Sequence, residues 1–335
     1  MKFKWRIFFG LIILALLVYL LIRINFVEVW TLVVKANNWY FFLTFLCYLA
    51  SFFIFDFKSA YFIKEIAPVS YFFNLKTTFA GFFVNMITPG SQLGGDPVRA
   101  YFIGKKYGKP KAKLLGIILA DKTIHVVVSI FFIMASILFI LAYIPVSFEL
   151  KVIFETLFFS ILLFLLFFGY VSFGKTGFNI EVFLKRFRWV FPKANSMRGR
   201  KTKLEKILIK HFGHFSKIFK TTLKDKELLI IGASWSTVYW LLHFLASYFL
   251  FLSFGQDVNF LLVIVVISMS NFLGTFSPIP GGIGLIEGAM ILFYSLLGVN
   301  LSIAVAVSLL SRIVFYFFSL VIGSISLVHL EHSVK

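Results

Sequence analysis

The stretch that decides the fold is "TPGSQLGGDPVRAYF", Thr88 to Phe102, which lies between the apolar runs "FAGFFVNMI" and "LLGIILA". It contains two prolines, three glycines, an aspartate and an arginine. In hydrocarbon, every backbone group released from a helix is costly unless protein or water satisfies it. An interruption of this kind is therefore expected inside a helix bundle or beside a polar cavity.

The composition around this stretch is that of a membrane protein. Hydrophobic residues make up 60% of the chain, and 47 of the 335 residues are Phe. No water-soluble domain of this length could bury that much apolar surface in one core. The first apolar segment follows Lys2, Lys4 and Arg6 and is long enough to span a bilayer. No small-residue cleavage site follows it, so we predict a retained span and a cytoplasmic N-terminus.

A spanning helix needs about 20 mostly apolar residues. This length predicts an all-α protein with six full spans, near Trp5–Ile24, Trp39–Phe57, Leu114–Tyr143, Val152–Phe173, Leu228–Phe254 and Leu301–Val328. Two further apolar regions, Tyr71–Tyr107 and Asn259–Val299, are each broken near the middle by a Pro/Gly cluster. We predict that each forms a re-entrant helical hairpin within a single transmembrane domain, residues 1–335.

Basic residues give the orientation. With the N-terminus inside, the exterior receives only Arg23, Lys35 and Lys151. The interior receives a dense block after residue 174 and, before it, Lys58, Lys64, Lys105, Lys106, Lys109, Lys111 and Lys113. This satisfies the positive-inside rule and predicts a multi-pass protein of the plasma membrane with both termini in the cytoplasm. The first hairpin then enters from the cytoplasm and the second from outside.

The two broken regions resemble each other, which suggests an inverted repeat. "NMITPGSQLGGD" (Asn85 to Asp96) and "NFLGTFSPIPGGIGLIE" (Asn271 to Glu287) each run from Asn through a proline and a Gly-Gly pair to an acid. The spacing from Asp96 to Asp121 equals that from Glu287 to Arg312, since 121 − 96 and 312 − 287 are both 25. Transporters often build a substrate site from broken helices that meet near the midplane. The alternative is that Gly and Pro merely allow close helix packing.

Six charged residues lie in or beside apolar segments: Asp96, Arg99, Asp121, Lys122, Glu287 and Arg312. A charge at a helix centre costs about 2.5–3.5 kcal/mol on insertion scales, so these residues should pair or face water. Asp96 and Arg99 could pair locally on one helical face. Asp121 and Lys122 could lie at the cytoplasmic interface. Glu287 and Arg312 have no nearby partner in sequence, and we predict a buried contact between them.

The pairing of "PGSQLGGDPVRAYFI" with "PIPGGIGLIEGAMILFYSLLGV" resembles the lysylphosphatidylglycerol synthase transmembrane-region family of flippase-like membrane proteins. The resemblance covers nearly the whole chain. Lys122 stands where the family pattern leads us to expect arginine, which keeps the charge but loses the bidentate fork. The positions that match the family pattern are Pro89, Gly90, Gly94, Gly95, Asp96, Arg99, Asp121, Pro280, Gly281, Gly282, Gly284, Glu287 and Arg312.

Together with Asn85, Asn271 and Lys122, all of these except Gly90 form the predicted substrate site. No phosphate loop, nucleophile–base set or aminoacyl-transferase domain is recognisable in the 335 residues, so we expect a transporter-like protein without a cofactor rather than an enzyme. The single cysteine, Cys47, offers neither a disulfide nor a Cys-rich metal site. His211 and His214 could ligate a metal at spacing three, but no further ligands join them, and we predict no metal site.

Residues 175–226 form a separate basic loop with 15 Lys and Arg residues. Apolar residues from Leu204 to Thr222 recur at helical spacing with lysines between them. We predict an amphipathic helix that lies on the membrane among anionic headgroups. Nucleic-acid binding is the alternative for any basic run, but two flanking spans argue against it.

These features favour a protein that moves a phosphate-bearing lipid, such as a phospholipid, an aminoacyl-phospholipid or a polyprenyl-phosphate sugar carrier. The rival is a membrane partner that presents lipid to a separate lysyl-lipid synthase or glycosyltransferase. A third interpretation is a transporter of small solutes or ions.

Overall fold

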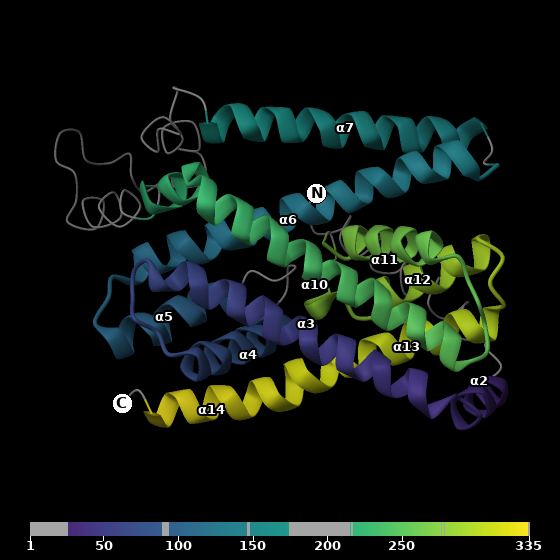
Figure 1. The fold of residues 1–335 in the computed structure, drawn as a ribbon, viewed down its shortest axis with the longest axis horizontal. Helices are drawn as coiled ribbons and strands as arrows, with labels where there is room; N and C mark the ends of the chain where they lie inside the picture. Colours follow the sequence, from purple (N-terminus) through teal and green to yellow (C-terminus); the bar gives the residue numbers. More distant parts are fainter. Residues whose placement is uncertain are drawn as a thin grey trace, which may run out of the picture.

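The computed structural model describes residues 26–88, 94–145, 148–173, 215, 217–275, 277 and 279–333 (Figure 1). These residues form helices and no strand. The helices are α2 (Phe26–Val34), α3 (Asn38–Lys64), α4 (Tyr71–Ile87), α5 (Gly95–Tyr107), α6 (Lys111–Tyr143), α7 (Phe148–Phe173), an unlabelled helix over 217–224, α10 (Lys226–Ser253), α11 (Phe260–Thr275), the short turn η2 (Pro280–Gly282), α12 (Leu285–Leu296), α13 (Leu301–Tyr316), η3 (Phe317–Ile322) and α14 (Gly323–Ser333).

Four helices in the described part of the chain are long and apolar enough to cross a membrane. They are α3, α6, α10 and the continuous helix Leu301–Ser333, which joins α13, η3 and α14. Each coincides with a predicted span. The predicted span Trp5–Ile24 lies outside the described residues. The predicted span Val152–Phe173 falls on α7, which is not one of these four helices. Both spans therefore stay predictions.

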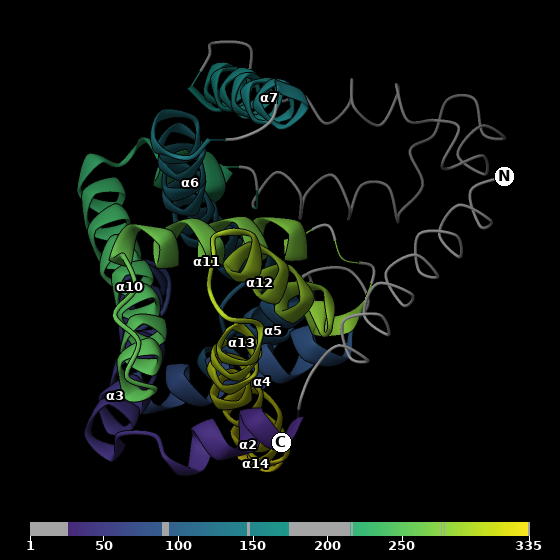
Figure 2. The same cartoon turned by 90° about the vertical axis from the view of Figure 1, so that its right-hand side faces the viewer.

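The distribution of side chains is the reverse of that in a water-soluble protein. Large apolar residues such as Phe131, Leu163 and Phe167 are more than half exposed. Charged and polar side chains such as Asp56 and Lys58 are buried. An exterior of this kind fits contact with lipid, which is as apolar as these side chains. α7 carries much of the exposed apolar surface and lies at the edge of the bundle against α6 (Figures 1 and 2).

The first broken region forms two antiparallel helices, α4 and α5. Phe73 near the start of α4 stacks edge-on against Tyr107 at the end of α5, with ring centroids 5.7 Å apart. At the other end, the Asn85 side chain accepts a hydrogen bond of 2.7 Å from the Gly95 N–H. A Cβ at Gly95 would stand 2.2 Å from the Gly81 carbonyl oxygen. Glycine at 95 is therefore what allows the two helices to touch along their backbones.

The second broken region places α11 against α12, with η2 between them. Gly281, Gly282 and Gly284 all have positive φ, at 65°, 67° and 82°. L-residues with a side chain rarely adopt this conformation, so the "PGGIG" sequence is a requirement of the turn itself. A Cβ on Gly281 would stand 2.6 Å from the methyl carbon of Met86, at the end of α4. The tips of the two broken regions therefore meet inside the molecule.

Helix ends gather at two opposite faces of the bundle. α3 begins, α10 ends and α13 begins at one face, whereas α5 and α14 end at the other (Figure 1). The Asn37 N–H donates to the Ser253 carbonyl oxygen at 2.7 Å, which fixes the start of α3 against the end of α10.

The basic loop departs in part from its predicted role. The part before residue 215 lies outside the described residues. In the helix over 217–224, Ile218 and Phe219 pack against the core cluster that includes Ile117 and Ile118 of α6. Leu223 is buried in the same cluster. Ile218 and Phe219 were predicted to enter the membrane surface, and that prediction is wrong for these two side chains because they pack, partly buried, against this cluster.

Candidate functional site

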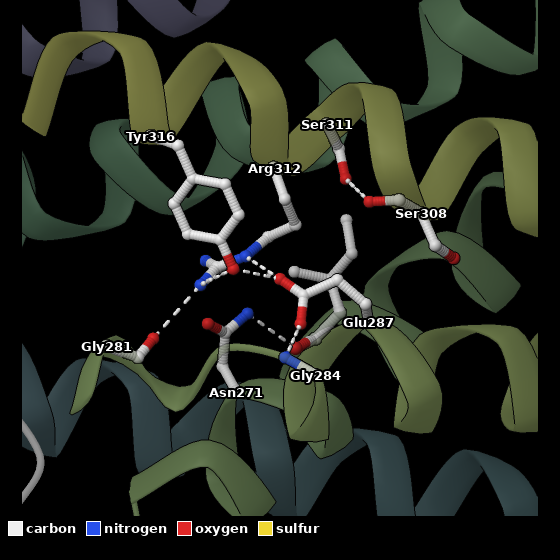
Figure 3. Close-up of polar contacts among 9 residues, drawn as sticks. Asn271, Gly281, Gly284, Glu287, Ser308, Ser311, Arg312 and Tyr316 are labelled. Carbon is white, nitrogen blue, oxygen red and sulfur yellow. Dashed lines mark hydrogen bonds and ion pairs between the residues drawn. The ribbon is translucent and has the colours of Figure 1, made fainter. Parts of the chain in front are cut away.

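The predicted contact between Glu287 and Arg312 is present. Arg312 Nε lies 2.8 Å from Glu287 Oε1, and both side chains are largely buried (Figure 3). Glu287 stands in the first turn of α12, and Arg312 lies one turn before the end of α13. Tyr316, one turn further along α13, donates its hydroxyl to the same Oε1 atom. Sequence reasoning missed Tyr316, although its spacing of four from Arg312 placed it on the same helical face.

Backbone groups of the glycine turn fix the polarity of this pair. The Gly284 N–H donates to Glu287 Oε2 at 2.6 Å. The Gly281 carbonyl oxygen accepts from Arg312 Nη2 at 3.3 Å (Figure 3). The turn thus offers a donor to the acid and an acceptor to the base. Since backbone groups cannot exchange roles, only this arrangement of the two charges satisfies the turn.

The corresponding acid of the first broken region also forms an ion pair, which is partly buried. Asp96, in the first turn of α5, accepts from Lys122 Nζ of α6 at 2.7 Å. The local pair of Asp96 with Arg99 that the sequence allowed is not formed, since Arg99 turns toward α3 and donates to Ser59. The repeat therefore aligns Arg312 with Lys122 rather than with Asp121. In each half, the acid that opens the second short helix pairs with a cation on the helix that follows.

Asp121 pairs with Lys58, which the sequence placed in a cytoplasmic loop. Lys58 Nζ lies 2.8 Å from Asp121 Oδ1 and donates to Ser236 Oγ of α10 at 3.1 Å. Lys58 is only 1% exposed. Lys58 is not in a loop because α3 continues beyond the predicted span end at Phe57 to Lys64. Its partner is 63 residues away in sequence, since 121 − 58 is 63.

Arg99 is the buried cation without a carboxylate partner among the described residues. It is 4% exposed, and its Nη2 atom donates to Ser59 Oγ of α3 at 2.5 Å. Its Nε atom has no partner. The side chain reaches α3 by crossing Gly81, where an added Cβ would stand 3.0 Å from the arginine Cδ. A guanidinium in this state retains donors for an anionic group.

Asp56 is a buried acid that sequence reasoning missed. It lies three residues before Ser59 on α3 and is 0% exposed. Its Oδ1 atom accepts from Asn74 Nδ2 at 2.7 Å and from Thr78 Oγ1 at 2.6 Å, both on α4. Its presence in the apolar run "FFIFDFKSAYF" was the available signal, because an acid inside a span is functional or paired by default.

The other predicted site residues occupy less connected places. Asn271 donates to the Ile267 carbonyl oxygen of its own helix at 2.8 Å, so it does not repeat the contact of Asn85 across its hairpin. Gly94 and Pro280 lie in the two turns, whereas Pro89 lies outside the described residues. His211 and His214 lie outside as well. Within the described ranges, His, Cys, Asp and Glu side chains form no group of three that could hold a metal.

Four apolar helices of spanning length, broken helices whose tips meet, and charges buried in pairs behind those tips define a polytopic helical membrane protein. The family follows from comparison. The model of the family described as "Lysylphosphatidylglycerol synthase TM region" matches residues 7–323, and the chain belongs to this family.

Curated relatives agree with this assignment. The chain is 27% identical over 264 residues to a "UPF0104 membrane protein" of Methanothermobacter thermautotrophicus, covering 76% of this chain and 74% of that protein. It is 28% identical over 259 residues to "UPF0104 membrane protein PH1989" of Pyrococcus horikoshii, covering 77% and 76%. A relative of Methanocaldococcus jannaschii, "UPF0104 membrane protein MJ1595", is 26% identical over 278 residues, covering 80% and 79%.

Proposed function

We propose that this protein moves a phosphate-bearing lipid between the leaflets of the plasma membrane. In this proposal, six full spans surround two half-membrane hairpins, α4–α5 from the cytoplasm and α11–α12 from outside, with both termini cytoplasmic. The lipid is a phospholipid, an aminoacyl-phospholipid or a polyprenyl-phosphate-linked sugar. Its headgroup passes the hairpin tips while its acyl chains stay in the bilayer.

The observation that carries this proposal is the meeting of the two tips at Met86 and Gly281, with a buried acid–cation pair behind each. Buried ionic groups inside a membrane protein mark substrate or ion pathways. Paired charges can exchange partners when a charged headgroup arrives, so that the site is never left with an uncompensated charge.

The preference for phosphate rests on Arg99. It supplies a guanidinium without a carboxylate in ion-pair contact among the described residues, one turn into α5, whose N-terminus carries the positive end of a helix dipole. Lys58, Lys122 and Arg312 each have a carboxylate already. An anionic ligand is therefore better matched to Arg99 than to any of these three cations.

The second candidate function is lipid presentation to a separate lysyl-lipid synthase or glycosyltransferase. The exposed apolar helices fit this role equally well, since they too require lipid around the protein. In either role, the basic loop over 175–226 is proposed to contact anionic headgroups, and no nucleic acid is expected as a partner.

Reconstitution distinguishes the two candidates. Liposomes that contain the purified protein and a headgroup-labelled fluorescent phospholipid are treated with a membrane-impermeant quencher. A translocase exposes inner-leaflet label to the quencher, whereas a presenting protein protects it. Arg99→Gln should abolish the movement, and Asp257→Asn, a carboxylate in the exposed turn after α10, is the matched control that should not. Movement of a phosphate-free fluorescent lipid at the same rate would contradict the phosphate preference.

A further inference from the structure

Two side chains that are hydrogen-bonded to each other each carry a buried oxygen atom that has no hydrogen-bond partner in the described part of the chain. One is Asp56 Oδ2 and the other is Asn74 Oδ1. The side chains are joined by the 2.7 Å bond from Asn74 Nδ2 to Asp56 Oδ1, and both residues are 0% exposed. Each of these two oxygens is a hydrogen-bond acceptor, and an acceptor that is buried without a donor destabilises the folded protein.

Asp56 also lacks an ion-pair partner among the described residues. Its hydrogen-bond partners, Asn74 and Thr78, are neutral, and no cation of the described residues lies within ion-pair distance of it. An isolated carboxylate in an apolar interior binds a proton rather than stay ionised. A proton on Oδ2 makes that atom a hydrogen-bond donor, and Asn74 Oδ1, on the side chain that is hydrogen-bonded to the same carboxyl group, is an acceptor without a partner.

We propose that Asp56 and Asn74 form a proton-binding site, and that this proton accompanies the lipid during transport. The step is a simple protonation: Asp56 Oδ2 gains one proton from water and the carboxylate becomes a neutral acid. This inference rests on the proposed function for its coupling role, whereas the proton site itself rests on the geometry alone.

The site is linked to Arg99 through Ser59. Asp56 and Ser59 lie on one face of α3. Arg99 donates a hydrogen bond to Ser59 and also interacts electrostatically with Asp56. While Asp56 holds a proton, the charge of Arg99 stays available for a phosphate. When the proton leaves, the carboxylate competes for Arg99 and expels the phosphate. Loading and release of the lipid would thus follow loading and release of the proton.

The other ionisable groups near Asp56 are already engaged. Tyr71 of α4 interacts electrostatically with it. Lys58 stands two residues along α3 and is held by Asp121 of α6 and Ser236 of α10. Arginine and tyrosine side chains keep their charge over about pH 5–8, so it is a movement of Arg99 or Tyr71, not a change in their charge, that would alter the proton affinity of Asp56.

The direct test is infrared difference spectroscopy of the full chain in lipid nanodiscs over about pH 5–8, where an ordinary aspartate is ionised. The parent protein should show the carbonyl band of a buried carboxylic acid, shifted in heavy water, which disappears as the pH rises. Asp56→Asn should lack that band, and Asp257→Asn should keep it. A parent without the band, or an Asp56→Asn variant that retains it, would overturn the proposal.

Thermal unfolding gives a second readout with a defined sign. A carboxyl that is protonated in the folded protein and ionised in the unfolded chain binds more protons when folded, so its contribution to stability is present at low pH and lost as the pH rises. The melting temperature of the parent relative to Asp56→Asn should therefore fall with rising pH. A dependence on Na⁺ at fixed pH that Asp56→Asn removes would instead indicate a metal ion and refute the proton.

A third arm separates the site from its coupling. Liposomes with a trapped pH indicator should report proton movement that accompanies lipid movement in the parent and is lost in Asp56→Asn. If no lipid moves with the parent protein, the proposed function fails while the infrared band still decides the proton site. If lipid moves without protons although the band is present, the coupling role is refuted. Should Asp56→Asn not fold, Thr78→Val serves: it removes a donor to the carboxylate and should move the loss of the band to higher pH.

Discussion

At the scale of single residues, the pairing of Glu287 with Arg312 is more constrained than two opposite charges would suggest. The Gly284 N–H and the Gly281 carbonyl oxygen bind the acid and the base respectively. Removing one partner of a buried pair typically costs about 3–5 kcal/mol, because it leaves a charge without compensation. Removing either side chain would also leave a backbone group of the turn without its hydrogen-bond partner.

We predict that Glu287→Gln destabilises the protein by about 3–5 kcal/mol and that exchanging the charges, Glu287→Arg with Arg312→Glu, does not restore stability. The exchange would place a donor against the Gly284 N–H and an acceptor against the Gly281 carbonyl oxygen. The neutral double variant, Glu287→Gln with Arg312→Gln, should recover part of the loss. Melting temperatures of these proteins check the order, and full recovery by the exchanged protein would show that the turn does not set the polarity.

The pair of Lys58 with Asp121 makes a similar prediction on the other side of the bundle. Lys58→Met should destabilise the protein by about 3–5 kcal/mol, because the Asp121 carboxylate stays buried without its cation. The further change Asp121→Leu should restore most of the stability. Lys64→Met, on the exposed end of the same helix, is the control and should shift stability by no more than about 0.5 kcal/mol. Equal effects of Lys58→Met and Lys64→Met would mean that Lys58 is solvated.

At the scale of elements, contact between α4 and α5 depends on the absence of a side chain at Gly95. Gly95→Ala would bring a Cβ to 2.2 Å from the Gly81 carbonyl oxygen and 2.9 Å from Asn85 Nδ2. We expect a loss of stability near the upper end of the overpacking range, about 3 kcal/mol, and loss of lipid movement as the hairpin opens.

The matched control is Gly108→Asn at the end of α5. Gly108 has φ 63° with no heavy atom within 4 Å of an added Cβ, and Asn tolerates this conformation better than other residues with side chains. Its melting temperature should stay close to that of the parent. If Gly95→Ala were equally harmless, the backbones of α4 and α5 would have to lie further apart than described.

At the scale of the whole molecule, the arrangement of helix ends predicts which surfaces face the cytoplasm. Single cysteines at Lys109 and Gln256, both exposed, lie at opposite ends of the bundle after α5 and α10. With Cys47 replaced, an impermeant thiol reagent should reach position 109 only from the cytoplasmic side and position 256 only from outside. Positions within 175–226 should behave like 109. Labelling of 109 and 256 from the same side would contradict the topology.

The sequence alone determined the features that depend on local composition. It predicted the helical membrane class, the positions of four spans, both interruptions and the contact of Glu287 with Arg312. These follow from the length of apolar runs, the behaviour of Pro and Gly, and the cost of an unpaired charge in an apolar segment. The requirement for glycine in "PGGIG" is also local, because it is set by the backbone conformation of the turn and not by contacts with distant residues.

Only the tertiary structure decided which distant groups meet. Lys58 was predicted to lie in a loop, but the packing of α3 and α6 places it beside Asp121. Asp96 pairs with Lys122 and not with Arg99, which is nearer in sequence. Asp56 was not predicted as a site residue. In the structure, α4 brings Asn74 and Thr78 to one of its carboxylate oxygens, and the other oxygen has no hydrogen-bond partner. Several partners in sequence satisfy the same pairing rule, and the packing of helices selects among them, because an ion pair or hydrogen bond forms only at contact distance.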